Sequence, residues 1–446
     1  MKLRRVLAVR AAKLVGKISR KMGKQGVTWA GLVARIIYPD ILQDLAGQLR
    51  GKSFIVCGTN GKTTTNNLLC SAIEAEGKKI ICNRTGSNMQ NGVVAAFVLA
   101  ADNQGKIDAD YACIEIDEAS TLKVLPRFKP DFMVLTNLFR DQLDRYGEID
   151  ITMDILKKAI KMAPDMTLLI NGDDSLSVTL AMETGNKYYT YGISEKVFDG
   201  DENSEIREGR FCKRCGAKMK YHFYHYSQLG DYECPNCGFK RPKIDFDASH
   251  IFVGDHLGFE VEGRRIEANY RGFYNIYNIL TAYSAGRVAG LAMDHFQDTL
   301  KHFNPENGRM EHFFIDGTKI ELNLAKNPAG FNQNIAAVME DKTPKDIIIL
   351  INDRFQDGED VSWLWDVDFD RFQDESIRSI TVSGIRCLDM RLRLKYVDIP
   401  SKVERNVADA IRERIKNGVG NLYVLVNYTG LYSTRNTLKK MEEESR

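Results

Sequence analysis

The sequence predicts an α/β protein whose main unit is built on a largely parallel sheet. Short buried-strand patterns alternate with helical patterns from about residue 50, and a phosphate-loop pattern separates the first strand from the first helix. The length of 446 residues suits two or three domains. We therefore expect a central domain with an inserted module, followed by a smaller C-terminal α/β domain.

The composition excludes several classes of protein. Hydrophobic residues make up 43% of the chain and charged residues 27%, as in an ordinary globular protein. The 62 Lys and Arg residues against 60 Asp and Glu leave a net charge of +2, so no nucleic-acid partner is expected. No stretch of about 18 apolar residues predicts a transmembrane helix, and no secretory signal follows the basic N-terminus. A cytoplasmic protein is expected.

Residues 1–45 are expected to form a basic helical segment. Nine Lys and Arg residues and no acid fall within residues 1–25. Apolar residues recur there at helical spacing, which indicates an amphipathic helix. These residues are Leu7, Ala11, Leu14, Ile18 and Met22. The helix either packs on the first domain with a solvated basic face, or makes a peripheral contact with the inner face of a membrane beside anionic lipid.

We assign residues 46–304 to the central domain. The segment Thr63–Glu76 is helical, and Gly77 is well placed to end it. Residues 205–245 are polar, rich in tyrosine and hold two Cys-x-x-Cys pairs, so we expect an insertion there. A helix around Tyr274–Val288 resumes the pattern. The expected strands are 53–57, 79–82, 111–116, 132–136 and 166–170.

Residues 305–446 are expected to form the smaller, Rossmann-like α/β domain. Three runs rich in apolar and β-branched residues have the pattern of buried strands. These runs are 346–351, 379–383 and 421–426.

The strongest functional signal is Gly58-Thr-Asn-Gly-Lys-Thr-Thr-Thr65, which follows a strand and opens a helix. Glycines let backbone N–H groups close around phosphate oxygens, and the helix N-terminus favours an anion. Lys62 can reach the β- and γ-phosphates, and the Thr63 hydroxyl can bind Mg²⁺. The alternative is a glycine turn before an ordinary helix. The predicted ATP-binding residues of the loop are Gly58, Thr59, Asn60, Gly61, Lys62, Thr63 and Thr64.

A phosphate loop needs an acid for its metal at the end of a neighbouring strand. Glu115, Asp117 and Glu118 lie at the end of the third expected strand. Strand alternation places Glu115 and Asp117 on the same face. We expect Glu115 to bind Mg²⁺ with Thr63 and to act with Lys62 in catalysis. The alternative is a solvated acidic loop.

Four of the nine cysteines form two Cys-x-x-Cys pairs that are separated by 18 residues. This spacing predicts a tetrahedral zinc site. Four thiolates close the coordination sphere, so the zinc would be structural. The predicted ligands are Cys212, Cys215, Cys234 and Cys237. His222 and His225 lie between the pairs and are expected at the surface.

Motifs along the chain resemble those of the Mur ligase superfamily. The phosphate loop is the first of them. The others are Thr136-Asn-Leu-Phe-Arg-Asp-Gln-Leu-Asp144, Gly272-Phe-Tyr-Asn-Ile-Tyr-Asn278, Gly308-Arg-Met-Glu311, and Asp316-Gly-Thr-Lys followed by Asn327-Pro. The resemblance covers roughly residues 45–340. It implies a Mur ligase-like fold and an ATP-dependent ligase that activates a carboxylate as an acyl phosphate.

Carried over residue by residue, the resemblance implies that Asn275 and Arg309 contact the nucleotide and that Asp316 contacts its ribose. Two residues depart from the family pattern. Gln142 stands where the family has a metal-binding His, and Tyr274 stands where it has another His. Only 57 residues precede the phosphate loop, which leaves no room for the family's UDP-binding domain. The acid substrate is therefore not expected to be held through UDP.

Residues 350–366 resemble the C-terminal signature of the MurT family, and the four-cysteine insertion fits that family too. The resemblance implies amidation of the α-carboxyl of D-glutamate in the lipid II stem peptide, giving D-isoglutamine. The ammonia would come from a separate, GatD-like glutaminase. It also implies that Asp360 or Asp357 orients the catalytic histidine of that partner. We favour Asp360, because Asp357-Gly358 reads as a turn pair.

Several alternatives stay open at this point. Asp360 could be part of a structural turn, and Trp363 and Trp365 are either interface anchors or core aromatics. The chain could be a stand-alone Mur-type or folylpolyglutamate-type amino acid ligase, or a nucleotide-binding zinc protein without ligase activity. None of the five unpaired cysteines has the setting of a glutaminase nucleophile, which supports the need for a partner.

Overall fold

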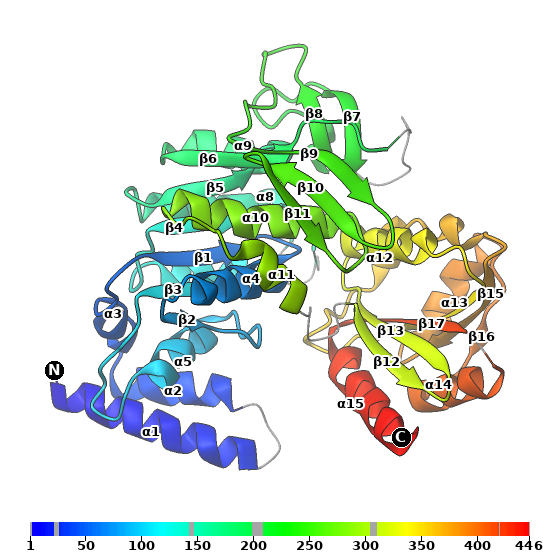
Figure 1. The fold of residues 1–446 in the computed structure, drawn as a ribbon, viewed down its shortest axis with the longest axis horizontal. Coiled ribbons are helices and arrows are strands. Elements are labelled where there is room, and N and C mark those ends of the chain that lie inside the picture. Colours follow the sequence, from blue (N-terminus) through cyan, green and yellow to red (C-terminus); the bar gives the residue numbers. More distant parts are fainter. Residues whose placement is uncertain are drawn as a thin grey trace.

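The structure is a computed structural model. It describes residues 2–21, 26–141, 147–198, 208–303, 310–418 and 420–445. Figure 1 shows a larger lobe, coloured blue to green, and a smaller lobe, coloured yellow to red. The larger lobe holds a nine-stranded sheet and the smaller lobe a six-stranded sheet. Helices alternate with strands in both, so the predicted α/β class is confirmed.

The nine-stranded sheet forms the centre of the larger lobe. Its strands are β1 (Ser53–Cys57), β2 (Ile80–Cys82), β3 (Tyr111–Glu115), β4 (Phe132–Leu135), β5 (Thr167–Asn171), β6 (Tyr188–Ile193), β9 (Phe246–Val253), β10 (Leu257–Val261) and β11 (Arg264–Ala268). The order is β11-β10-β9-β6-β5-β4-β1-β3-β2. Pairs from β2 to β9 are parallel, whereas β10 and β11 join as antiparallel neighbours. β1 and β4 are buried at every position, as a sheet covered on both faces requires.

Helices cover both faces of this sheet (Figure 1). They are α4 (Lys62–Ala75), α5 (Gln90–Ala100), η1 (Glu118–Ser120), α6 (Thr121–Val124), α8 (Ile149–Lys161), α9 (Ser175–Thr184), α10 (Tyr274–Val288) and α11 (Phe296–His302). α4 and α10 pack together and share one apolar core, while α5, α8 and α9 contribute to a second. The core of the lobe is therefore divided between the two faces of the sheet.

Three helices precede β1. They are α1 (Lys2–Lys21), α2 (Val27–Ile37) and α3 (Ile41–Ala46). α2 packs so closely on α5 that a Cβ added to Gly31 would lie 1.8 Å from the carbonyl oxygen of Asn91. Only glycine allows that approach. Among the described residues, no helix combines the length and the apolar content that crossing a membrane would need.

α1 forms the outermost layer of the larger lobe (Figure 1). The predicted helix is confirmed, and it packs on α2 through small residues such as Ala8, Val9 and Ala12, which are fully buried. Leu7 and Leu14 are 52% and 59% exposed. Periodicity identified which residues share a face of this helix, but the larger apolar residues face solvent.

The predicted insertion contains a two-stranded antiparallel sheet. Its elements are η2 (Glu208–Arg210), β7 (Lys220–Tyr226) and β8 (Leu229–Glu233). The described part of the insertion begins at residue 208. β7 and β8 extend from the top of the larger lobe in Figure 1, beyond β9.

The smaller lobe is a six-stranded sheet with helices around it. Its strands are β12 (Glu311–Ile315), β13 (Thr318–Leu324), β14 (Lys345–Leu350), β15 (Ile377–Ser383), β16 (Lys402–Val403) and β17 (Asn421–Val426). Its helices are α12 (Pro328–Glu340), η3 (Ser362–Asp366), η4 (Phe369–Phe372), α13 (Cys387–Lys395), α14 (Val407–Lys416) and α15 (Tyr428–Ser445). The order is β12-β13-β17-β14-β15-β16, and β12 forms the one antiparallel pair among the described strands of this sheet.

Candidate active site

The phosphate loop joins the end of β1 to the start of α4, as the sequence predicts. Gly58 and Gly61 have φ values of +119° and +82°, which residues with a side chain rarely adopt. At Gly61 a Cβ would also lie 2.1 Å from Oδ1 of Asn278 in α10. The loop is therefore held tightly between β1 and α10, and it leads directly into the N-terminus of α4.

Lys62 is only 9% exposed, and its ammonium lies within the loop. It donates to the carbonyl oxygens of Gly58 and Thr59 and forms an ion pair of 3.0 Å with Oε1 of Glu118. Burial alone would lower the pKa of Lys62, but Glu118 and the other acidic groups around it, Glu115 and Asp117 among them, together outweigh burial, so the pKa is raised. Burial raises the pKa of Glu118, although Lys62 opposes this shift. Lys62 is therefore held as a cation in the phosphate loop.

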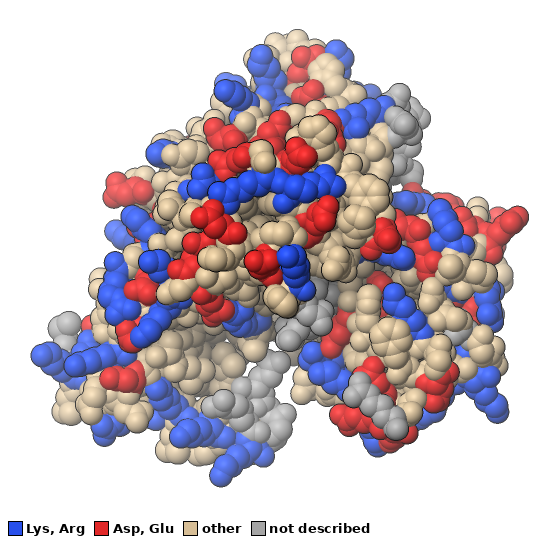
Figure 2. All heavy atoms as spheres, viewed as in Figure 1, with Lys and Arg blue, Asp and Glu red and all other residues tan. Residues whose placement is uncertain are grey.

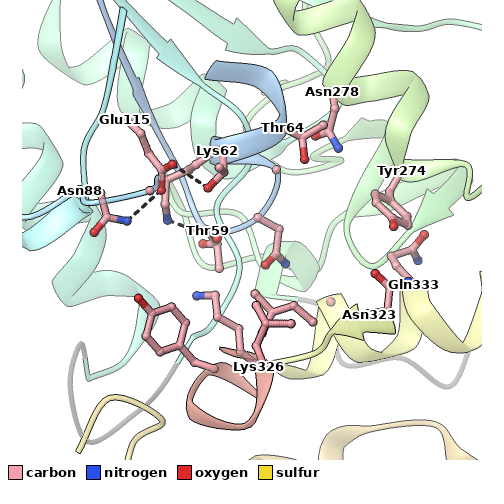
Figure 3. Close-up of a pocket in the computed structure, with 18 of the residues that line it drawn as sticks. Thr59, Lys62, Thr64, Asn88, Glu115, Tyr274, Asn278, Asn323, Lys326 and Gln333 are labelled. Carbon is pink, nitrogen blue, oxygen red and sulfur yellow. Dashed lines mark hydrogen bonds between the residues drawn. The ribbon is translucent and has the colours of Figure 1, made fainter. Parts of the chain in front are cut away.

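Thr63 and Glu115 meet where the start of α4 faces the end of β3. The Thr63 hydroxyl donates to Oε2 of Glu115 at 2.6 Å, and the Asn88 amide donates to Oε1 at 2.9 Å, as Figure 3 shows for Asn88. The side chain of Asn83 holds the backbone of Glu115 through two further hydrogen bonds of 2.8 Å. A hydroxyl and a carboxylate are oxygen ligands of the kind that Mg²⁺ prefers. The two predicted magnesium ligands are thus brought together.

A cavity of about 450 Å³ lies between the phosphate loop and the smaller lobe. This volume is within the range of about 300–1,000 Å³ that is typical of small-molecule sites. The larger lobe lines it with loop residues 59–64, Glu115, Asp117 and the first turn of α10. Among the residues that the smaller lobe contributes are Asn323, Lys326, Gln333, Tyr428, Tyr432 and Arg435.

The first turn of α10 lines the cavity with the predicted nucleotide contact Asn275. Its side-chain amide donates to the carbonyl oxygen of Arg271 at 2.9 Å and accepts from the Asn278 amide at 3.0 Å. Tyr274, which departs from the family pattern, lines the same cavity and lies across it from Glu115 in Figure 3. An aromatic ring at this position can pack on a flat ligand.

Polar contacts hold the smaller lobe against the phosphate loop. The side chains of Asn60 and Asn327 exchange hydrogen bonds of 3.3 and 3.1 Å. Lys326 forms an ion pair with Asp141. Burial alone would raise the pKa of Asp141, but Lys326, with smaller contributions from Lys62 and Asn327, outweighs burial and lowers the pKa. The cavity therefore has cations on both sides, Lys62 from the larger lobe and Lys326 from the smaller.

The structure does not bring every predicted residue to the cavity. Asp316 occupies the turn between β12 and β13 with φ at +47°, and its carboxylate accepts a hydrogen bond of 2.7 Å from Ser445 near the end of α15. It is not among the cavity-lining residues, because the hairpin turn lies at the opposite end of β13 from Lys326. Arg309 and Gln142 lie outside the described residues.

The four paired cysteines converge, with their Sγ atoms all within 4.8 Å of one another. The Cys212 and Cys237 sulfurs are 3.6 Å apart, and those of Cys215 and Cys234 are 3.5 Å apart. Tetrahedral zinc with Zn–S bonds of about 2.3 Å separates its ligands by about 3.8 Å. In each pair, the glycine after the second cysteine donates its N–H to the carbonyl of the first, at 2.8 and 3.1 Å. The donor set fits a structural zinc ion.

The prediction that His225 lies at the surface is wrong. β7 packs its inner face toward α10, so His225 is 3% exposed, while His222 on the same strand is exposed as predicted. Nδ1 of His225 lies 2.6 Å from the Tyr277 hydroxyl, and Nε2 lies 2.9 Å from the carbonyl oxygen of Glu195. The Tyr277 hydroxyl donates to Asp173 at 2.7 Å. Burial lowers the pKa of His225, and this network ties the insertion to α10.

The two candidate aspartates of the smaller lobe have different environments. Asp357 is 3% exposed, and the N–H of Thr429 donates to its Oδ1 at 2.7 Å. The Thr429 hydroxyl and the N–H of Arg354 donate to its Oδ2. Asp360 is half-exposed and accepts from the N–H and hydroxyl of Ser362 at 2.8 and 2.9 Å. Asp357 therefore anchors the start of α15, whereas Asp360 reaches the surface.

Of the two tryptophans, one is a core aromatic and the other is exposed, as an interface anchor would be. Trp363 is 6% exposed and packs 6.1 Å from the ring of Phe331, so it is a core aromatic. Trp365 is 49% exposed, and its ring meets the edge of Tyr396 at 5.0 Å. The guanidinium of Arg393 lies 5.6 Å from the Trp365 ring. Trp365 has the exposure that an interface anchor needs.

Sequence reasoning missed three contributors to this site: Asn88, Lys326 and the ion pair that Glu118 makes with Lys62. Lys326 directly precedes the Asn327-Pro motif, and Glu118 belongs to the acidic cluster at the end of β3, so both had a local signal. Asn88 had none, because it reaches Glu115 from the loop before α5.

Comparisons with known proteins agree with this architecture. The Mur ligase middle domain matches residues 56–238, and the MurT ligase C-terminal family matches residues 324–431. A Staphylococcus aureus (strain COL) protein, lipid II isoglutaminyl synthase (glutamine-hydrolyzing) subunit MurT, is 36% identical over 431 residues, which is 96% of each chain. The protein of the same name from Streptococcus pneumoniae (strain ATCC BAA-255 / R6) is 30% identical over 98% of each chain.

Solved structures share the fold. A pseudomurein peptide ligase type C from Methanothermus fervidus matches with a TM-score of 0.69 at 20% identity, covering 89% of this chain and 80% of its own. The MurF ligase from Thermotoga maritima in complex with ADP matches with a TM-score of 0.63 at 13% identity, covering 91% and 83%. At these identities the likeness shows the fold alone. With the full-length relatives, it establishes that this chain belongs to the MurT family of ligases and has the Mur ligase fold.

Proposed function

We propose that this chain amidates the α-carboxyl of D-glutamate in the lipid II stem peptide, using ATP and ammonia, and so forms D-isoglutamine. The observation that carries the proposal is the match to MurT subunits over nearly the whole chain, including the match of residues 324–431 to the MurT ligase C-terminal family. The cavity between the lobes supplies the groups that such a reaction requires.

The chemistry proceeds through an activated acid. A carboxylate does not react with ammonia unaided, because its oxygen is a poor leaving group and its charge repels the nucleophile. Attack of the carboxylate oxygen on the γ-phosphorus of ATP breaks the bond to the bridging oxygen and gives ADP and an acyl phosphate. Ammonia then attacks the acyl carbon, phosphate leaves, and the nitrogen loses a proton. Positioning and charge neutralisation supply most of the catalysis in phosphoryl transfer.

The residues around the phosphate loop fit these needs. The backbone N–H groups of the loop and the ammonium of Lys62 would hold the β- and γ-phosphates. Thr63 and Glu115 would hold Mg²⁺, which neutralises phosphate charge when bound, and Asn88 keeps the carboxylate of Glu115 oriented. Lys326 stands on the opposite side of the cavity as a cation for the substrate carboxylate.

Nucleotide binding extends from the loop toward α10 in this proposal. Asn275 and Tyr274 line that side of the cavity. The four-cysteine site would hold zinc as a structural ion, because four thiolates leave no ligand position for a reacting molecule.

The ammonia would come from a GatD-like glutaminase. A glutaminase needs an activated cysteine nucleophile, and all nine cysteines lie in the described part of the chain. Of the five outside the zinc cluster, four are buried and Cys82 is half-buried. Burial raises the pKa of Cys57 and Cys70, so these thiols do not ionise readily. These cysteines support the assignment of glutamine hydrolysis to a second polypeptide.

The partner would dock on the face of the smaller lobe that carries Asp360. The half-exposed Asp360 carboxylate can orient a histidine of the partner, fix its tautomer and stabilise its cation. Trp365 and Tyr396 stand exposed on the same lobe, and α13 exposes Leu388 and Leu392, at 55% and 49%. Aromatic and leucine side chains of this kind serve as anchors in protein interfaces.

The test is a reconstituted reaction. The purified chain is mixed with a cognate glutaminase, glutamine, ATP, Mg²⁺ and lipid II, and the product is analysed by mass spectrometry. We expect one stem carboxyl to become an amide, with one ADP formed per amide. Absence of the amide while the glutaminase remains active would refute the proposal, and ligation of an amino acid without any partner would favour a stand-alone ligase instead.

A further inference from the structure

α1 presents its large apolar side chains to solvent. Leu3, Leu7, Leu14 and Ile18 are 74%, 52%, 59% and 50% exposed. Residues four and seven apart lie on one stripe of a helix, so these four side chains form a continuous line along α1. Since the helix packs on the protein through small residues on its opposite face, the exposed stripe makes no contribution to the core.

The exposed stripe is accompanied by positive charge. α1 carries Lys and Arg residues but no acid. Arg5 pairs with Asp44, and Lys13 donates to a backbone carbonyl, so these two cations fasten the helix to the lobe. Arg10 and Lys17 are exposed beside the stripe, although Arg10 also donates to the carbonyl oxygen of Asn103 at 3.1 Å. Figure 2 shows Lys and Arg atoms along the lower edge of the molecule, where α1 lies in Figure 1.

The neighbouring helix α2 also exposes large apolar side chains. Trp29 and Ile36, seven residues apart on one stripe, are 57% and 71% exposed. Several large apolar side chains exposed along one helix, as on α1, mark an interaction site. Tryptophan is favoured where an apolar phase meets water, because its ring is apolar and its N–H needs a polar partner.

We infer that α1 and α2 form a membrane-binding surface that lies flat in the interface of an anionic bilayer. It consists of Leu3, Leu7, Leu14, Ile18, Trp29 and Ile36 with the flanking Lys and Arg residues. Apolar side chains enter the acyl boundary while the basic residues meet anionic headgroups. The same positive charge disfavours contact with a second copy of the chain. This inference rests on the proposed function only for the purpose of the surface, which would be to bring the cavity to a lipid-linked substrate.

Vesicle binding by the full chain tests the surface. The probe is phosphatidylcholine vesicles with and without phosphatidylglycerol, and the bound fraction is measured by flotation. We expect the chain to bind the anionic vesicles more tightly than the neutral ones. High salt should weaken its binding to the anionic vesicles. The double variant Leu7→Glu/Leu14→Glu should lose about tenfold or more in affinity. The matched control is Ile151→Glu/Met182→Glu, whose parent residues are 52% and 48% exposed on α8 and α9; it should bind like the parent.

Three results would overturn the inference. They are equal binding by the Leu7/Leu14 variant and the parent, equal loss in the control variant, and a self-association in sedimentation velocity that the Leu7/Leu14 change abolishes. Far-UV circular dichroism and the melting temperature verify that both variants are folded. Because flotation uses neither ATP nor a glutaminase, its outcome is independent of the ligase reaction. Amidation of a water-soluble stem peptide should be unchanged in the Leu7/Leu14 variant.

Discussion

The phosphate loop and the segment 357–366 both carry carboxylates at a functional surface, but they arrange them in opposite ways. Around the loop, Glu115 and Glu118 are buried beside their partners within the chain. In segment 357–366, Asp357 is buried while Asp360 and Trp365 reach the surface. The first region encloses its carboxylates within one chain, whereas the second leaves a carboxylate and an aromatic ring at the surface, where the proposed partner would bind.

The largest effect is expected from Asp360→Asn, which tests the proposed role of segment 357–366. The asparagine keeps the shape of the side chain but cannot stabilise a histidine cation, so glutamine hydrolysis by the complex should fall by roughly 10²–10⁴-fold. Glutamate release in the presence of the partner measures this. Amidation driven by added ammonium salt should be retained, because the loop and cavity are untouched. If hydrolysis persists at the parent rate, Asp360 does not act on the partner.

Lys62→Met tests the proposed role of the phosphate loop. Loss of the cation should reduce amidation roughly 10²–10³-fold, whether ammonia comes from glutamine or from ammonium salt. It also leaves Glu118 buried without its partner, which should lower the free energy of unfolding by about 3–5 kcal/mol. The double variant Lys62→Met/Glu118→Gln separates the two effects. It should regain stability in chemical denaturation while remaining inactive; recovery of activity would contradict the assigned role of Lys62.

Asp357→Ala should act on stability rather than on the partner reaction. The change leaves the N–H of Thr429 without the carboxylate that accepts its hydrogen bond at the start of α15. A buried donor without its acceptor costs about 1–3 kcal/mol. Urea unfolding measures the loss, and Asp360→Ala is the matched control, expected to lose less stability because the Ser362 N–H and hydroxyl that it releases are exposed to water. Equal losses in the two variants would erase the distinction between the two aspartates.

The smallest effect concerns His225, a buried group outside both regions. Burial lowers its pKa in the folded protein, so below about pH 6.5 the unfolded chain binds more protons. Its contribution to stability is therefore present above that pH and is lost as the pH falls below it. Melting temperatures from pH 8 to pH 5 should fall less steeply in His225→Gln than in the parent. His222→Gln on the same strand should follow the parent, and a flattened curve there would contradict this assignment.

The features that the sequence predicted correctly are those whose signal lies in a short local pattern. A strand, a glycine loop and a helix in that order located Lys62 and Thr63, and alternation along β3 located Glu115. Cysteine spacing located the four thiolates that converge in the structure. Each of these signals lies within a few consecutive residues.

What the sequence could not reveal depends on which surfaces meet. The burial of His225 depends on β7 packing against α10, which lies about 50 residues further along the chain. Asn88 and Lys326 reach the cavity only because separate elements converge there. The stripe on α1 has the same periodicity whether it faces the core or solvent, and small residues on the opposite face decided the direction.

The grip of Asp357 on Thr429 has a further consequence. Thr429 follows Tyr428, which borders the cavity between the lobes, and Asp360 lies only three residues beyond Asp357 along the chain. The buried Asp357 thus fastens the segment that carries Asp360 to the segment that borders the cavity. A glutaminase bound at Asp360, as proposed above, would therefore contact a part of the smaller lobe that is hydrogen-bonded directly to the cavity wall.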